Sequence, residues 1–259
     1  MKLNIVPART GLLWVRLGLR TFWRQPLALS GLFFRYFMSM TLASLVPYVG
    51  MVLALALVPA ATLGFIAATR QASEGQFPMP SILLSAFRAG REQARAMVVL
   101  GAFYALGFLA VIGASALADG GQFARLSLVG GELTREMVES DPFQNALWTS
   151  MALYLPFSLL FWHAPALVHW HGVSPLKSLF FSLVACLRNF RAMVVFFLGW
   201  MGVFMAVGML AIMLTALIGQ PELMGNIMFP AAMMLAAMFF SSIWFTFRDS
   251  FVTTEDAPP

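Results

Sequence analysis

The sequence predicts an all-α membrane protein, a polytopic bundle of six transmembrane helices. Of its 259 residues, 60% are hydrophobic and only 10% are charged, whereas a soluble domain carries about 25% charged residues. A soluble fold of this length cannot bury so much apolar surface, and a disordered chain requires low hydrophobicity and high charge. The apolar residues also form long unbroken runs instead of ten-residue alternations, which excludes a β-barrel. The chain is therefore expected to cross a bilayer as helices.

Six apolar runs are long enough to cross a hydrocarbon core about 30 Å thick, which requires about 20 helical residues. The predicted spans cover residues 27–46, 49–69, 96–117, 145–168, 192–218 and 227–247. We also predict an outer loop over residues 118–144 and a polar C-terminal tail over residues 249–259. Together these parts form one predicted transmembrane domain over residues 1–259.

Basic residues mark one side of the membrane. The N-terminal segment, the second and fourth connections and the tail hold 13 of the 16 Lys and Arg residues, while the opposite side holds only Arg125 and Arg135. Because cytoplasmic connections carry the excess of Lys and Arg, both termini are predicted to lie in the cytoplasm.

The sequence repeats itself at a spacing close to 97 residues. Four residues recur in order: Pro78, Ser81, Ser85 and Arg91 reappear as Pro175, Ser178, Ser182 and Arg188. A motif that begins at Arg95 reappears from Arg191, and a fainter third copy surrounds Arg20. Each copy is predicted to be a cytoplasmic amphipathic helix followed by two spans, so that the copies form a parallel internal repeat.

The amphipathic interfacial helices are predicted over residues 8–24, 79–95 and 175–191. In the first helix Arg16, Arg20 and Arg24 fall within one arc, and Trp14 and Phe22 lie on the opposite side. Such helices lie in the headgroup plane, with rings on the acyl chains and guanidinium groups near the phosphates. Either the three helices only anchor the bundle, or they ring a cytoplasmic vestibule that binds anionic lipid or an anionic ligand.

Arg35 is the charged residue inside a predicted span. It follows Pro26 by nine residues, which places it about 13 Å into the helix, where an arginine costs about 3 kcal/mol on insertion scales. None of the six spans contains Asp or Glu to pair with it. Arg35 therefore either snorkels toward an interface or meets an anion or a lipid phosphate. The lack of carboxylates in the spans also disfavours an ion-coupled transporter.

The sequence contains no motif typical of catalysis or metal binding. It lacks G-x-S-x-G, a phosphate-binding loop, H-E-x-x-H and C-x-x-C. We predict a non-enzymatic protein without metal or cofactor, whose partners are anionic membrane lipids or other membrane proteins and not nucleic acid. The residues predicted to bind lipid or another anion are Arg20, Arg24, Arg35, Arg88, Arg91, Arg95, Arg188 and Arg191. The alternative is a transporter or channel for a small or lipid-like solute.

Four stretches carry a family resemblance: Arg9–Arg16, Phe22–Ala28, Phe180–Val184 and Arg188–Arg191. In them the chain resembles a family of bacterial inner-membrane proteins with six helices and no assigned function. The pattern of a basic amphipathic helix followed by a hairpin is also similar to YciC-like proteins and to the membrane domain that precedes some glycerophosphodiester phosphodiesterases. The resemblance implies a six-helix inner-membrane protein. It implies no catalytic residue, because the sequence contains no phosphodiesterase domain.

Overall fold

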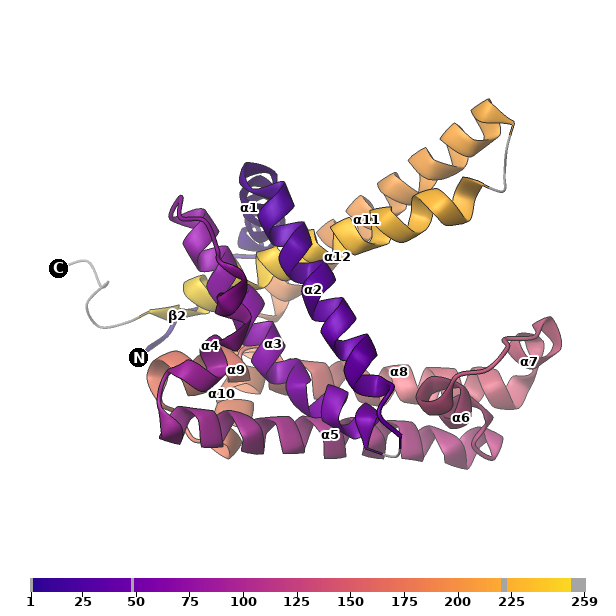
Figure 1. Ribbon diagram of the computed structural model, residues 1–259, viewed down its shortest axis with the longest axis horizontal. Coiled ribbons are helices and arrows are strands. Elements are labelled where there is room, and N and C mark those ends of the chain that lie inside the picture. Colours follow the sequence, from indigo (N-terminus) through magenta and orange to yellow (C-terminus); the bar gives the residue numbers. More distant parts are fainter. Residues whose placement is uncertain (1, 48, 220–222, 253–259) are drawn as a thin grey trace. The chain divides into compact units, whose positions relative to one another are not determined.

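The structure, a computed structural model, describes residues 2–47, 49–219 and 223–252, and within them the chain is almost entirely helical (Figure 1). The elements in chain order are β1 (Lys2–Leu3), α1 (Thr10–Arg24), α2 (Pro26–Ser44), α3 (Gly50–Ser73), the short 3₁₀ helix η1 (Pro80–Leu84), α4 (Ser85–Arg88), α5 (Arg91–Asp119), α6 (Gln122–Val129), α7 (Arg135–Glu139), α8 (Asp141–Phe161), α9 (Ala164–His171), α10 (Pro175–Arg188), α11 (Phe190–Ile218), α12 (Leu223–Ser250) and β2 (Phe251–Val252).

Six segments of the described chain are long and apolar enough to cross a membrane. They are α2, α3, α5, α8 together with α9, α11 and α12. Each of them carries one of the six predicted spans, which confirms the all-α polytopic fold. Pro26 begins α2, where its missing N–H group leaves no helical hydrogen bond unmade.

The predicted outer loop over residues 118–144 contains more helix than we expected from the sequence. Helix α5 continues to Asp119, and α6 and α7 follow. The Asp119 carboxylate accepts hydrogen bonds from the backbone N–H groups of Gly121 (2.8 Å) and Phe123 (2.6 Å), which caps the first turn of α6. At the other end of the chain, α12 continues to Ser250 and β2 follows, and residues 253–259 of the predicted tail lie outside the described residues.

The described residues gather into two compact units. The first unit is drawn from residues 1–39, 61–89 and 184–259, and the second from residues 40–60 and 90–183. The assignment of the whole chain to one transmembrane domain stays a prediction.

In the first unit, α1 packs against α11 and α12. A Cβ atom at Gly18 would lie only 2.5 Å from the Cβ of Ser242 on α12, so only a glycine permits this close approach. Trp14, Val15 and Phe22 are buried in this contact. From the sequence we expected the apolar side of this helix to face acyl chains. That expectation is corrected, because protein covers these side chains.

Helices α11 and α12 lie side by side as a hairpin (Figure 1). Near its base the Trp200 indole N–H donates a hydrogen bond to the Ser242 hydroxyl (3.1 Å), and the Trp200 ring packs against Phe239 at 5.5 Å between centroids. In the most apolar 18-residue stretch of α11, only 11% of the residues are buried. The remaining apolar side chains of α11 therefore face outward, as expected for a helix whose solvent is lipid.

The second unit is built on the pairing of α5 with α8, and α6 and α7 lie at one end of this pair (Figure 1). The Tyr104 ring packs against Phe157 and Phe161, at 5.2 Å and 5.0 Å between centroids. A Cβ atom at Gly107 would overlap the Phe157 ring, so this glycine lets α5 meet the ring directly. An aromatic cluster thus holds the two longest helices of this unit together.

The fourth span is interrupted between α8 and α9, at Trp162 and His163. In an unbroken helix the His163 N–H would bond to the Leu159 carbonyl. Instead the Ser182 hydroxyl of α10 accepts from the His163 N–H (2.9 Å) and donates to the Leu159 carbonyl (2.8 Å). Pro165 lacks an N–H group and cannot restore the helical pattern. A side chain inserted into the hydrogen-bond ladder therefore explains the break.

Candidate functional site

All eight arginines predicted to bind lipid or another anion are exposed. Arg20 and Arg24 lie on α1, Arg35 on α2, Arg88 on α4, Arg91 and Arg95 on α5, Arg188 at the end of α10 and Arg191 in the first turn of α11. The first unit holds six of them, and the second unit holds Arg91 and Arg95. The ring of three basic helices around one vestibule stays a prediction.

The eight guanidinium groups share a second property. Across residues 2–47, 49–219 and 223–252, none of the eight forms an ion pair. Other arginines are paired with carboxylates: Arg70 with Glu74, Arg135 with Glu139 and Arg248 with Asp249. An exposed guanidinium with no carboxylate partner keeps its donors available for an external anion.

The predicted helix over residues 79–95 is not continuous. The chain forms η1 and α4, breaks at Ala89 and Gly90, and begins α5 at Arg91. Gly90 has φ +123°, a backbone conformation that favours glycine and ends a helix. Arg88 therefore does not share a helical face with Arg91 and Arg95, which corrects the prediction of one amphipathic helix over residues 79–95.

Arg188 and Arg191 come together at one cavity in the first unit. The cavity, which we call the terminal cavity, has a volume of about 560 Å³. It is lined by Ile5, Val6, Pro7, Ala8, Leu187, Arg188, Asn189, Phe190 and Arg191. This lining contains two guanidinium groups and no carboxylate, and its remaining side chains are apolar except for Asn189. The terminal cavity thus suits a ligand with an anionic group next to apolar atoms.

Asn189 fixes the shape of the terminal cavity. The residue is 2% exposed and joins α10 to α11. Its Oδ1 accepts a hydrogen bond from the Val6 N–H (2.9 Å), and its Nδ2 donates to the Asn4 carbonyl (3.0 Å) and the Ser250 hydroxyl (3.3 Å). One buried amide therefore holds the N-terminal segment and the end of α12 against the start of α11.

The two ends of the chain are also paired directly. Strands β1 and β2 are antiparallel, with Lys2 opposite Val252 and Leu3 opposite Phe251. This pairing lays the first described residues of the chain beside the last ones.

Asp249 adds a contact from the end of α12 to α1. Its carboxylate accepts a hydrogen bond from the Trp14 indole N–H (2.8 Å) and forms an ion pair with Arg248 (2.7 Å). The end of α12 is thus held against α1 by a side-chain hydrogen bond.

Helix α10 turns its small side chains inward and its large apolar ones outward. Ser178, Ser182 and Ala185 are each 0% exposed, whereas Phe180 is 61% and Leu187 is 54% exposed. An aqueous helix shows the reverse pattern. This pattern is the one expected of a helix at the membrane boundary, and the interfacial position of α10 stays a prediction. The prediction extended this helix to residue 191, but it ends at Arg188 and Arg191 belongs to α11.

Arg35 lies on the exposed side of α2, and its guanidinium forms no ion pair or hydrogen bond in the described part of the chain. Leu29, Leu32 and Phe33 form the buried side of the same helix. Arg35 is therefore not directed into the core of its unit, and it does not line the terminal cavity.

Sequence reasoning missed Asn189 and the segment Ile5–Ala8. Asn189 is uncharged, and its partners lie 61 and more positions away in the sequence, so no local pattern revealed them. The one available signal was Asn189 between Arg188 and Arg191, a polar residue that interrupts an otherwise helical run. Among the residues that the structure describes, there is no group of three or more His, Cys, Asp or Glu residues that could hold a metal ion.

No protein-family model matches this sequence, and no solved structure matches it. A curated protein of Burkholderia thailandensis, named probable inner membrane protein BTH_II0599, is 38% identical to the chain over 262 residues, which cover 100% of this chain and 97% of the relative. The similarity extends over all six membrane-capable helices. The chain therefore belongs to the family of this inner membrane protein.

Proposed function

We propose that this protein is a non-enzymatic inner-membrane protein that binds anionic phospholipid at its cytoplasmic face, with both termini in the cytoplasm. The observation that carries the proposal is the terminal cavity, where Arg188 and Arg191 flank an apolar wall without a carboxylate. The exposed arginines of α1, α4 and α5 supply further positive charge.

The chemistry of the terminal cavity fits a phosphodiester headgroup. A guanidinium presents a planar fork of donors that matches two phosphate oxygens. Each arginine near an anionic leaflet contributes about 1 kcal/mol of attraction. The neighbouring Ile5 and Phe190 are 56% and 59% exposed, and they offer apolar surface to the lipid atoms next to the phosphate.

The outward aromatic face of α10 supports a place for this cavity at the membrane boundary. Helix α10 ends at Arg188, and only Asn189 separates it from α11, which is one of the six membrane-capable segments. Phe180 and Leu187 can enter the acyl region while Arg188 and Lys177 stay at the headgroup level.

The proposal is tested by native mass spectrometry of the full-length protein released from detergent micelles with phosphatidylglycerol or cardiolipin added. We expect the wild-type protein to retain these lipids and the Arg188→Gln/Arg191→Gln variant to retain them about thirtyfold less, from roughly 1 kcal/mol for each arginine. The matched control is Arg135→Gln, which removes an arginine on the opposite side. Equal retention by all three proteins would refute the proposal, and flux of a solute through reconstituted liposomes would favour the transporter alternative.

A further inference from the structure

We propose that a pocket at the start of α5 binds a zwitterionic headgroup, a primary ammonium next to a phosphate, as in phosphatidylethanolamine. The pocket belongs to the second unit and has a volume of about 430 Å³. It is lined by Glu92, Gln93, Arg95, Ala96, Val99, Val168, Gly172, Val173, Ser174 and Pro175. We call it the α5 pocket. Its ligand differs from the anionic lipid proposed for the terminal cavity.

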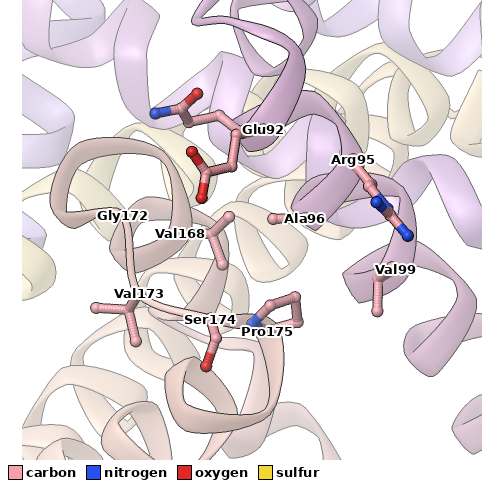
Figure 2. Close-up of a pocket in the computed structure, with 10 residues that line it drawn as sticks. Glu92, Arg95, Ala96, Val99, Val168, Gly172, Val173, Ser174 and Pro175 are labelled. Carbon is pink, nitrogen blue, oxygen red and sulfur yellow. The ribbon is translucent and has the colours of Figure 1, made fainter.

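The α5 pocket contains one side chain of each charge. Glu92 and Arg95 are both exposed, lie one helical turn apart on α5, and form no ion pair with each other. Figure 2 shows the Glu92 carboxylate above Val168, while the Arg95 guanidinium extends to the other side of Ala96. The two charges therefore stand at separate ends of the pocket instead of neutralising each other.

This arrangement selects against ligands of a single charge. The Glu92 carboxylate would repel a purely anionic group that approached Arg95. In the same way, the Arg95 guanidinium would repel a simple cation that approached Glu92. A zwitterion places its ammonium at Glu92 and its phosphate at Arg95, and it satisfies both. A primary ammonium has three N–H donors for the carboxylate, whereas the quaternary ammonium of a choline headgroup has none.

The walls between the two charges favour a lipid. Ala96, Val99 and Pro175 line the pocket with apolar side chains, and Val99 is 37% exposed. The first turns of α5 are also the beginning of the third span, so the pocket opens where a headgroup meets the acyl region. The side chains of Gln93 and Ser174 offer additional polar atoms at its rim.

The test compares lipid retention by the full-length protein in native mass spectrometry, with phosphatidylethanolamine, phosphatidylcholine and phosphatidylglycerol added at equal concentration. We expect the Glu92→Gln variant to retain phosphatidylethanolamine about tenfold less than wild type, the loss expected when a charge-assisted hydrogen bond is removed. Its retention of phosphatidylglycerol should not fall, because that lipid has no ammonium. The matched control is Glu139→Gln, which removes an exposed carboxylate of α7 in the same unit.

Soluble phosphoethanolamine, added as a competitor, distinguishes a lipid from a free zwitterion as the source of the headgroup. Competition shows that the headgroup alone is recognised, and a lack of competition shows that the acyl chains are also required. Either result, together with the Glu92 effect, supports the pocket chemistry. The inference is overturned if Glu92→Gln retains phosphatidylethanolamine as wild type does, or if wild type does not prefer it to phosphatidylcholine. Because Arg188→Gln/Arg191→Gln leaves the α5 pocket intact, failure of this inference is distinguishable from failure of the proposed function.

Discussion

At the scale of single residues, buried neutral groups position the charged ones. Asn189 joins three chain segments through one amide, and the Ser182 hydroxyl replaces a helical hydrogen bond within the fourth span. Both are buried, at 2% and 0% exposure. A buried polar group without partners is costly, so these side chains specify the local geometry more strictly than an exposed arginine can.

The Asn189→Ala variant tests this role. It deprives the Val6 N–H and the Asn4 carbonyl of their partner, and we expect the free energy of unfolding to fall by about 2 kcal/mol. Thermal unfolding in detergent, followed by circular dichroism, measures the change. Asn145→Ala, at an exposed position of α8, is the matched control. Equal melting temperatures for the two variants would show that Asn189 does not hold the termini.

Cys186 gives a second prediction at this scale. Burial raises the pKa of its thiol from 9.0 to about 12, because the thiolate loses its hydration. At pH 9 the folded protein should therefore react with a maleimide only very slowly, with roughly one thiol in a thousand ionised, whereas the protein unfolded in SDS should react fully. Labelling of the folded protein at the unfolded rate would contradict this.

The raised pKa of the Cys186 thiol also makes the stability of the folded protein depend on pH. The folded protein keeps a proton that the unfolded chain releases above about pH 9, so the free energy of unfolding should decline as pH rises from 9 toward 12. Below pH 9 the thiol is protonated in both states and contributes no pH dependence. A Cys186→Ser variant should lack this part of the decline.

At the scale of elements, close packing decides the place of α1. Its basic arc and apolar side suggested a helix in the headgroup plane. In the structure the buried side contacts α11 and α12, and Leu12, Leu13 and Trp23 remain exposed beside the arginines. Helix α1 therefore uses one side for protein contacts and has a mixed side of arginines and apolar groups available for the membrane.

The Gly18→Ala variant tests this packing. Its Cβ would lie 2.5 Å from the Ser242 Cβ and 2.8 Å from the Ser242 Cα, so the helices must move apart, at a cost of about 1–3 kcal/mol. We expect a lower melting temperature and faster tryptic cleavage after Arg20. A Cβ added at Gly31 of α2 would meet no atom within 4 Å, so Gly31→Ala should be neutral or slightly stabilising. The prediction fails if both variants behave alike.

At the scale of the whole molecule, membrane topology determines which leaflet each charged surface faces. The pairing of β1 with β2 joins the first and last described residues, and an even number of spans predicts that both ends of the chain lie on one side of the membrane. The distribution of Lys and Arg predicts that this side is the cytoplasm. The proposals for the terminal cavity and the α5 pocket both concern the cytoplasmic leaflet.

Cysteine reporters test this topology in spheroplasts, because the buried Cys186 contributes little background. A membrane-impermeant maleimide should label Glu139→Cys on α7 from outside, and it should label Lys177→Cys on α10 only after permeabilisation. Both positions are exposed. The reverse pattern would invert the topology and place the terminal cavity at the outer leaflet.

Sequence alone determined the six spans and the all-α class of this protein, because a span needs only a long apolar run, and such a run is local in the sequence. It also located the arginines of the candidate site. It could not show that Arg88 and Arg91 lie on separate helices, because the break depends on the backbone conformation of Gly90. Nor could it reveal the pairing of β1 with β2, since two-residue strands carry no periodic pattern.

Only the tertiary structure decided which side of α1 is buried, which arginines share a cavity and that Glu92 and Arg95 line one pocket with residues of α9 and α10. The physical reason is that the hydrophobic effect fixes which segments leave water, whereas side-chain contacts fix how those segments meet in lipid. Such contacts join residues as distant as Asn4 and Asn189, and they depend on shape and hydrogen bonding that composition does not encode.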